Sequence, residues 1–264
     1  MTRWQTEAVV LGADARGESD RLVQLFTPSA GRLWTLAKGA LKSRKRFAGL
    51  FDGPQVIEVG LMSWTRTSRA LIEHADLVAG FPAFRQKPER LCRAYALVEL
   101  ARALVPEESP APGLYVLLRR GLFRLQAEPD RDRWLLAYAF RMLAAAGHQP
   151  ELSACVCCRK GASREAVFLP EEGGVVCAGC AGGRHGLPVS ADTSRTLAAV
   201  IGASEKGLGR LGFTANAVRQ GRELLEHFIA HQLADPSRSL GVLRELEGWR
   251  APSVGARAGH RGQG

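Results

Sequence analysis

The sequence lacks the short motifs by which many enzymes are identified. It contains neither the HExxH pattern of zinc proteases nor the GxSxG pattern of serine hydrolases. The segment GASEKGL, residues 202–208, has leucine at the position where a phosphate-binding loop requires lysine. The carboxylates are scattered, with no grouping typical of metal-assisted phosphodiester chemistry. The sequence therefore predicts a protein that is not an enzyme.

Long apolar runs are also missing. The N-terminal MTRWQTEAVV has no basic segment followed by a long apolar core, which a secretory signal requires. The most apolar helical stretch, residues 134–147, is interrupted by Arg141 and is too short to span a bilayer. We therefore expect a cytoplasmic protein, whose thiols remain reduced.

Acidic residues are in deficit. The chain of 264 residues has 26 Asp and Glu against 36 Lys and Arg, which gives a net charge of +10. This excess indicates a polyanionic partner, either nucleic acid or an acidic membrane surface. Charge alone names no activity, because basic ribosomal and lipid-binding proteins share the same balance.

The first 80 residues have the pattern of a small all-β domain. Short stretches rich in Val, Leu and Ile are separated by turns that contain glycine or proline. The expected strands are Glu7–Leu11, Arg21–Phe26, Arg32–Lys38, Gln55–Leu61 and Ala70–Val78. Five such strands fit a small closed barrel, the oligonucleotide-binding (OB) fold being one option, but a small sandwich would have the same periodicity.

From Pro88 onward the apolar residues recur with helical spacing. Helices are expected from Pro88 to near Pro106, at Leu114–Leu125, from about Asp130 to Ala146, at Thr193–Ile201, at Asn216–Leu233 after an N-cap at Thr214, and at Ser237–Leu246. The predicted organisation is a β domain at 1–80, a helical domain at 81–150 and 186–248, an insertion at 151–185, and a basic tail at 249–264. The tail's small, polar composition predicts disorder.

Five of the six cysteines lie between Cys155 and Cys180. Cys155-x-x-Cys158 and Cys177-x-x-Cys180, separated by 18 residues, have the spacing of a four-thiolate zinc site. The intervening AVFLPEEGGVV predicts a β-hairpin that returns the chain to the second pair. Four thiolates leave no open position on the metal, so the predicted zinc is structural.

Alternatives to this zinc site are less well supported. A redox CxxC needs only one pair, and neither pair has a thioredoxin-like context. A cysteine–histidine catalytic pair with His148 or His185 is conceivable but rests on proximity in sequence alone. Replacing Cys155 by Cys157 as a ligand would require two adjacent thiols, Cys157 and Cys158, which is poor geometry for a knuckle. Cys157 is therefore expected to be the extra thiol.

A basic segment, AKGALKSRKRFAGLF, connects the third and fourth expected strands. It carries five cations within nine positions and no acid; these are Lys38, Lys42, Arg44, Lys45 and Arg46. Such a loop can bind a phosphate backbone, and Arg66 and Arg69 near the last strand could extend its surface. Phe47 and Phe51 could stack on bases, but they are more simply interpreted as side chains that plug the end of the barrel.

The order of these features resembles the bacterial recombination-mediator family RecO. The residues that carry the likeness are Gly17-Glu18-Ser19-Asp20-Arg21, Leu25-Phe26-Thr27 before Gly31, Ala37 to Ala40 before the basic residues, Pro150 and Leu152 before the first cysteine pair, and Arg238 to Leu246. Cys157 departs from the family's usual knuckle. The resemblance implies an α+β fold with an N-terminal five-stranded OB barrel, a helical domain and an inserted zinc-binding hairpin.

The same resemblance implies a function in bacterial DNA repair, in the RecF pathway. Members bind single- and double-stranded DNA, anneal complementary strands, and act with RecR and the single-strand-binding protein SSB to load RecA. This implies a nucleoid-associated protein of the cytoplasm with no membrane partner. The contact with the C-terminal tail of SSB falls in the helical domain of the family, where Arg119, Arg120 and Arg124 alternate with leucines. A helix with one polar face is an equally simple interpretation of these arginines. The alternative function is a zinc-ribbon nucleic-acid-binding or ribosome-associated protein without recombination activity.

Overall fold

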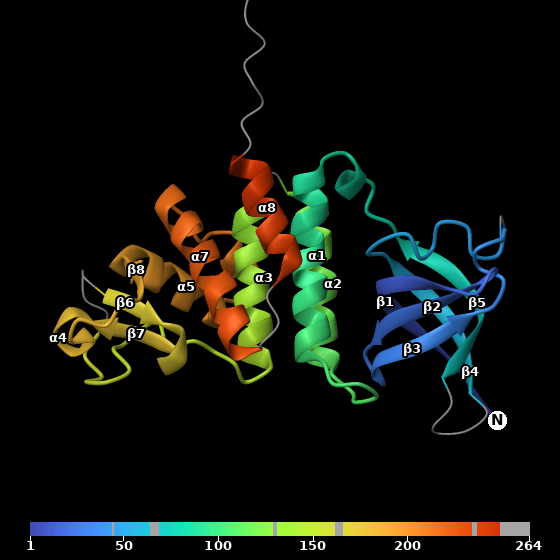
Figure 1. The fold of residues 1–264 in the computed structure, drawn as a ribbon, viewed down its shortest axis with the longest axis horizontal. Helices are drawn as coiled ribbons and strands as arrows, with labels where there is room; N and C mark the ends of the chain where they lie inside the picture. Colours follow the sequence, from blue (N-terminus) through green and yellow to red (C-terminus); the bar gives the residue numbers. More distant parts are fainter. Residues whose placement is uncertain (44, 64–68, 129–130, 162–165, 234–236, 249–264) are drawn as a thin grey trace, which may run out of the picture.

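A computed structural model describes residues 1–43, 45–63, 69–128, 131–161, 166–233 and 237–248. The molecule is elongated, with a β-barrel at one end, a set of helices in the middle and a small cysteine-containing sheet at the other end (Figure 1). This is the mixed α+β architecture expected from the sequence. The basic tail, residues 249–264, lies outside the described residues, as do Arg44 and Arg66.

The N-terminal part is a closed barrel with the strand order β1-β2-β3-β5-β4. Its strands are β1 (Thr2–Arg16), β2 (Asp20–Thr27), β3 (Gly31–Ala37), β4 (Val56–Ser63) and β5 (Ala70–Ala79). Neighbouring strands are antiparallel except β3 and β5, which are parallel and close the barrel. The expected barrel is thus confirmed and the sandwich is excluded.

Strand β1 is much longer than the expected Glu7–Leu11. Its first half pairs with β4 and its second half with β2, with a register shift between Val10 and Gly12. The apolar pattern identified only the centre of the strand, because both ends are largely exposed and carry polar residues. The long strand serves two neighbours, and the irregularity lets it bend from one to the other.

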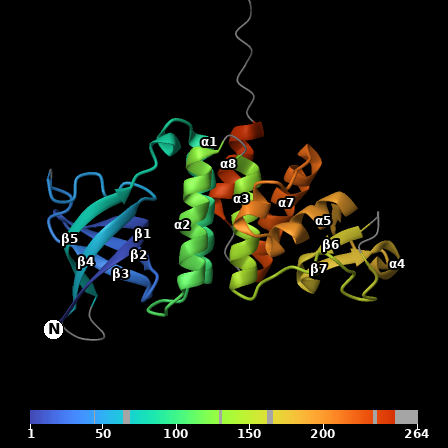
Figure 2. The same cartoon turned by 180° about the vertical axis from the view of Figure 1, so that it is seen from behind.

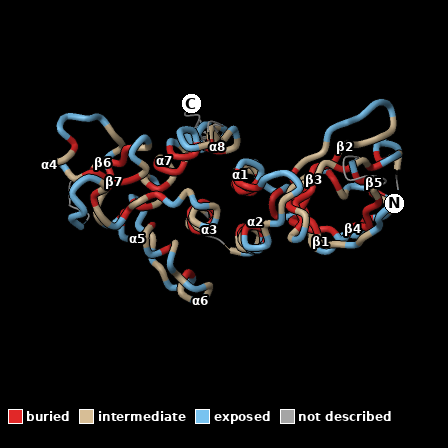
Figure 3. The backbone as a smooth tube through the Cα atoms, turned by 90° about the horizontal axis from the view of Figure 1, so that it is seen from below, coloured by how far each residue is buried: buried red, intermediate tan, exposed pale blue. Residues whose placement is uncertain are grey.

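Buried segments occur along the strands of the barrel as well as in the helices (Figure 3). Inward- and outward-facing residues of the strands belong to two different cores. Val23 and Leu25 belong to the barrel core, whereas Val9 and Phe26 face outward and join the core of the helical domain. The barrel wall therefore forms part of the surface against which the helices pack.

The helical part begins after the short helix η1 (Pro82–Arg85). Its helices are α1 (Pro88–Leu104), α2 (Pro112–Ala127), α3 (Arg131–Ala145), α5 (Ala191–Gly202), α6 (Glu205–Leu208), α7 (Ala215–Gln232) and α8 (Arg238–Gly248). Helix α3 is central: residues 134–140 are buried, and the helix packs against α1, α2, α5 and α7. The expected helices are confirmed within a few residues, including the N-cap Thr214, whose hydroxyl accepts from the Ala217 N–H. The short α6 was not expected.

The barrel lies beside α2 (Figure 2), and two of the contacts between the barrel and the helical part involve Tyr115 and Gly31. The ring of Tyr115 on α2 packs edge-on against Phe26 at 5.4 Å between centroids, and its hydroxyl donates to Glu7 at 2.7 Å. At the β2–β3 turn, Gly31 has a φ of +65°, and a Cβ there would lie 2.0 Å from the carbonyl oxygen of Ser109. Glycine is therefore needed both for the turn and for the approach of the α1–α2 loop.

The cysteine-containing part is a three-stranded sheet with the order β7-β6-β8. Strands β6 (Ala166–Leu169) and β7 (Gly174–Cys177) form the expected hairpin, with the short helix η2 (Pro170–Glu172) at its turn. Helix α4 (Ala178–Ala181) follows β7, and β8 (Leu187–Val189) adds a third strand beside β6. The elements α4 and β8 are only three or four residues long, which is too short for periodicity to reveal.

Candidate nucleic-acid interface and metal centre

The basic loop between β3 and β4 is fixed to the barrel at its first turn. The carboxylate of Asp20 accepts hydrogen bonds from the N–H of Gly39 at 2.8 Å and from the hydroxyl of Ser19 at 2.9 Å. These bonds, in that order, lower the pKa of Asp20. The N–H of Leu41 donates to the Ser19 carbonyl at 2.8 Å, and Gly39 has a φ of +69°, which favours glycine. The segments 17–21 and 37–40 therefore form one structural unit.

The structure places the predicted DNA-binding cations differently from one another. Lys38, Lys42 and Lys45 are exposed on the loop, and Arg69 is exposed just before β5. Arg46 instead reaches across to β5, where it donates to the carbonyl oxygens of residues 72 and 73, and its guanidinium lies 4.5 Å from the centre of the Phe47 ring. Three lysines thus face solvent on the loop, while Arg46 also anchors it.

Phe47 and Phe51 do not present their rings to solvent. Both are buried in the barrel core, with 5.5 Å between their ring centres. The interpretation as plugs of the barrel end is confirmed, and these rings are not available for stacking on bases.

Sequence reasoning missed Trp34 on β3. Trp34 pairs with Gln24 on β2, and because Val23 and Leu25 line the barrel core, both Gln24 and Trp34 lie on the outer face. Trp34 is half-buried, and the amide of buried Gln24 forms no hydrogen bond with any described residue. In OB folds the outer face of the second and third strands is the usual oligonucleotide surface. The alternation of Leu33, Trp34 and Thr35 was the feature of the sequence from which an outward-facing Trp34 could have been predicted.

The three arginines predicted to contact a partner are already paired with carboxylates. Arg119 lies 2.9 Å from Glu7, Arg120 lies 3.4 Å from Glu205, and Arg124 lies 3.0 Å from Glu128. The guanidinium of Arg124 also covers the ring of Trp134 on α3 at 4.7 Å.

Only Arg119 and Arg120 lie beside exposed apolar groups on α2. These groups are Val116 and Phe123, and the spacing of all four residues puts them on one helix face. The partner contact stays a prediction, with Arg124 set apart from the other two.

The four cysteines of the two CxxC pairs come together. Cys155 and Cys158 lie on the loop before β6, Cys177 ends β7 and Cys180 lies in α4. Their sulfur atoms all lie within 4.8 Å of one another, and the Cys158 and Cys177 sulfurs are 3.8 Å apart. A zinc ion bound tetrahedrally at about 2.3 Å from each sulfur requires sulfur–sulfur separations of about 3.8 Å. The donor set and its spacing therefore fit a metal of this kind.

Backbone groups prepare the cluster for negative charge. The N–H groups of Cys158 and Cys177 lower the pKa of Cys155 to about 6. By contrast, hydrogen bonds with the thiols of Cys177 and Cys158 raise the pKa of Cys180 to about 12. The backbone N–H groups thus favour negative charge on the Cys155 sulfur, and a bound metal ion would displace the protons that remain on the other thiols.

Cys157 lies outside the group of four sulfurs. It is exposed, and the Arg184 guanidinium lies 3.7 Å from its sulfur while also pairing with Glu172 at 2.6 Å. The structure thus supports the expected ligand register and leaves Cys157 as the extra thiol.

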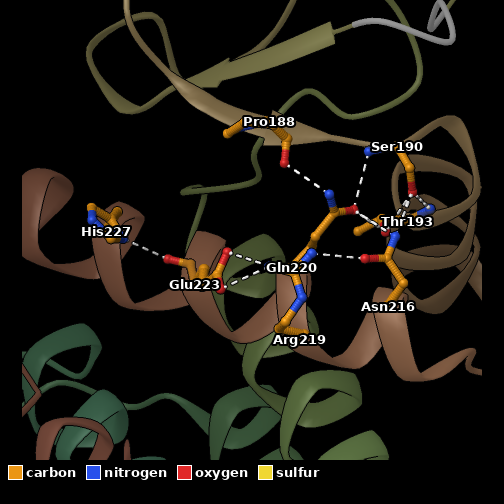
Figure 4. Close-up of polar contacts among 8 residues, drawn as sticks. All are labelled: Pro188, Ser190, Thr193, Asn216, Arg219, Gln220, Glu223 and His227. Carbon is orange, nitrogen blue, oxygen red and sulfur yellow. Dashed lines mark hydrogen bonds and ion pairs between the residues drawn. The ribbon is translucent and has the colours of Figure 1, made fainter.

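One side chain of α7, Gln220, joins the cysteine module to the helices (Figure 4). Its amide N–H donates to the Pro188 carbonyl on β8 at 3.0 Å. Its amide oxygen accepts from the Ser190 N–H at 3.1 Å and from the Thr193 hydroxyl at 2.6 Å. Gln220 thus connects β8, the start of α5 and α7. Nothing in the local sequence pattern identified this contact.

The segment Gly207-Leu208-Gly209-Arg210-Leu211-Gly212 has the GxGxxG spacing of dinucleotide sites. It covers the end of α6 and the turns after it, and no strand leads into it. A dinucleotide site needs this sequence between a strand and a helix, so the spacing carries no such function here. Among the described residues, no helix is both long and apolar enough to cross a membrane.

Comparison with known proteins finds similarity over nearly the whole chain. Residues 1–80 match the family model of the recombination protein O N terminal domain, and residues 85–241 match that of its C terminal domain. The DNA repair protein RecO of Myxococcus xanthus is 34% identical over 248 residues, which cover 93% of this chain and 99% of the relative. That of Anaeromyxobacter dehalogenans strain 2CP-C is 36% identical over 253 residues, covering 94% and 97%. The RecO protein of Geobacter sulfurreducens is 33% identical over 244 residues, covering 91% and 97%. The chain belongs to the RecO family.

Proposed function

We propose that the protein is a DNA-binding recombination mediator in bacterial DNA repair. Its relatives carry the name DNA repair protein RecO, which supports this role. The observation that carries the proposal for this chain is the set of exposed lysines, Lys38, Lys42 and Lys45, on a loop fixed to the barrel directly after the strand of Trp34. Ammonium groups bind phosphates whatever the base sequence, and an outward aromatic ring can stack on a base.

The mechanism that follows needs no bond to be broken. Strands held by their phosphates keep their base edges free, so two complementary strands can pair while bound. The protein would bind single- and double-stranded DNA with little base preference and would promote annealing. With RecR, it would help to load RecA onto single strands coated with SSB. Such a protein works on chromosomal DNA in the bacterial cytoplasm.

The outer face of α2 is the proposed contact for the acidic, apolar C-terminal tail of SSB. Arg119 and Arg120 supply positive charge, and exposed Val116 and Phe123 supply apolar surface beside them. An Arg119→Ala/Arg120→Ala variant is expected to lose binding of the tail peptide, whereas Arg124→Ala is expected to retain it. Full retention of peptide binding by the double variant would show that this face of α2 is not the contact for the SSB tail.

The four-cysteine group is proposed to hold a structural zinc ion. Four thiolates would complete its coordination, leaving no position for a substrate. The metal's role would be to hold the knuckle loop, β7 and α4 together, because this module has a small core of its own.

A salt titration of DNA binding tests the main proposal. The Lys42→Ala/Lys45→Ala variant is expected to flatten the dependence of log K on log salt by roughly 0.7–0.9 for each phosphate that is no longer neutralised. Lys206→Ala removes an exposed charge at α6 and is the matched control. An unchanged slope in the double variant would show that the loop does not bind the phosphates of DNA.

Annealing of complementary strands coated with SSB tests the mediator activity separately. The wild-type protein is expected to accelerate annealing, and Lys42→Ala/Lys45→Ala to reduce the effect. DNA binding without any annealing would favour the alternative, a zinc-ribbon nucleic-acid-binding or ribosome-associated protein without recombination activity.

A further inference from the structure

Two adjoining hollows lie along the second half of β1, where the barrel meets the helices. One, of about 590 Å³, is bordered by β1, α1 and the start of α8. The other, of about 360 Å³, is bordered by β1, α1 and the basic loop, including Leu41. Both are lined by Leu11, Gly12, Ala13 and Tyr95. They are therefore two halves of one trough, which leads from the basic loop to the helical domain.

The floor of the trough is a glycine that the protein's own packing does not require. Gly12 lies inside β1 at its register shift, and a Cβ there would meet no atom within 4 Å. Its φ does not fall in the left-handed range, so the backbone does not demand glycine either. Glycine in a strand interior costs stability, and where no neighbour explains it, close approach of a ligand is a physical reason for it.

The wall formed by the helical domain carries free positive charge. Arg102 at the end of α1 and Arg238 at the start of α8 both line the larger hollow and are exposed. Within the described part of the chain, neither forms an ion pair or hydrogen bond. Glu99, which lines the same wall, is occupied, since its carboxylate accepts from the hydroxyls of Ser237 and Ser239, each at 2.6 Å.

The remaining lining residues also suit a nucleic acid. Arg32 adds a third cation, loosely paired with Glu107 at 3.6 Å. Two further carboxylates border the trough: Asp14 on β1, and Asp52, which pairs with Arg21 at 2.7 Å. Tyr95 borders both halves of the trough, is half-buried and forms no hydrogen bond with any described residue. Cations beside an aromatic ring are the usual elements of a single-strand site, in which phosphates follow the cations and a base stacks on the ring.

We propose that a single strand of nucleic acid runs from the basic loop along this trough, crosses closely over Gly12, and places phosphates on Arg102 and Arg238. This proposal rests on the DNA-binding function proposed above and extends it to the helical domain. A single strand suits the trough better than a duplex, because its backbone is flexible and its bases are free to stack on Tyr95. A duplex keeps its bases paired inside, where they cannot stack on Tyr95. Its rigid helix also cannot enter a trough between two packed elements, β1 and α1.

Binding of a fluorescent single-stranded oligonucleotide to the full chain tests this path. The Arg102→Ala/Arg238→Ala variant is expected to reduce the slope of log K against log salt by roughly 0.7 for each phosphate that these arginines neutralise. Lys206→Ala is the control for the loss of an exposed charge. Gly12→Val, which fills the floor without a change of charge, is expected to weaken single-strand binding at every salt concentration with an unchanged slope. Duplex binding is expected to change little in Gly12→Val.

The outcomes separate the trough from the function on which it rests. If the wild-type protein binds DNA through its loop lysines but Arg102→Ala/Arg238→Ala binds single strands like Lys206→Ala, the proposed path along the trough is contradicted and the proposed DNA-binding function stands. If the wild-type protein does not bind DNA, the proposed function fails as well. Should Gly12→Val not fold, Gly12→Ala gives a smaller obstruction, and the arginine variant alters only exposed side chains and still decides the question.

Discussion

The carboxylate of Asp20 accepts a hydrogen bond from the backbone N–H of Gly39 at 2.8 Å. The two residues lie on β2 and on the turn after β3, and their contact fixes the point from which the basic loop leaves the barrel. An acidic residue among basic ones would weaken DNA binding if charge alone mattered. Its position indicates that the shape of the loop matters too.

An Asp20→Ala variant separates these two effects. It raises the net positive charge, so electrostatics alone would strengthen DNA binding. We expect weaker binding instead, because the N–H of Gly39 loses its acceptor and the lysines lose their fixed positions. Filter binding at low salt measures the change, with Glu58→Ala as a control that removes an exposed carboxylate from β4 of the barrel. Tighter binding by Asp20→Ala would contradict the proposed role of the loop's shape.

The extra cysteine allows a matched test of the metal centre. Cys158→Ser removes one of the four clustered sulfurs and is expected to reduce bound zinc strongly and to loosen the cysteine module. Cys157→Ser changes the neighbouring thiol, which is outside the cluster, and is expected to keep the metal. Metal content after dialysis, together with proteolysis of the module, gives the readout. Equal zinc loss in both variants would show that the ligand register is wrong.

Gln220 is expected to hold the cysteine module against the helices. Gln220→Ala leaves the Pro188 carbonyl and the Ser190 N–H without this partner, and the loss of a hydrogen bond of this kind costs about 0.5–1.5 kcal/mol. Hydrogen exchange is expected to accelerate in β6 and β8 with little change in α1. Gln232→Ala, which breaks a single exposed bond to the Pro170 carbonyl, is the control. Uniform acceleration throughout the chain would point to general destabilisation instead.

Glu205 should make stability depend on pH. Burial alone would raise its pKa, but hydrogen bonds from Arg141 at 2.6 Å and Tyr138 at 2.9 Å outweigh burial and lower it below 4.5. A lowered pKa means stabilisation that is fully present above pH 4.5 and is lost as the pH falls through the folded-state pKa.

At pH 7 the Glu205→Gln variant is therefore expected to be less stable by about 1 kcal/mol, since the carboxylate is partly exposed. This difference should shrink in acid. Urea unfolding between pH 7 and pH 3 measures it, with Glu223→Gln, which alters a surface ion pair on α7, as the control. A difference that stays constant with pH would contradict the assignment.

The features that depend on local spacing were predictable. The five strands followed from period-two alternation and turn residues, and the main helices from the change of period after Pro88. The spacing of the two cysteine pairs predicted the cluster of four sulfurs. Each CxxC suits two ligands of one ion, and the hairpin returns the second pair to the first.

The sequence by itself therefore determined the order of the parts, the cluster of four cysteines and the position of the basic loop. The tertiary structure alone decided which side chains are engaged. It folded Arg46 back onto β5, paired Arg119 with Glu7, turned Trp34 outward opposite Gln24, and set Gln220 against β8. A local pattern fixes which face of an element is buried, but a side chain's partner is a residue distant in the chain. That partner is set only when whole elements pack together.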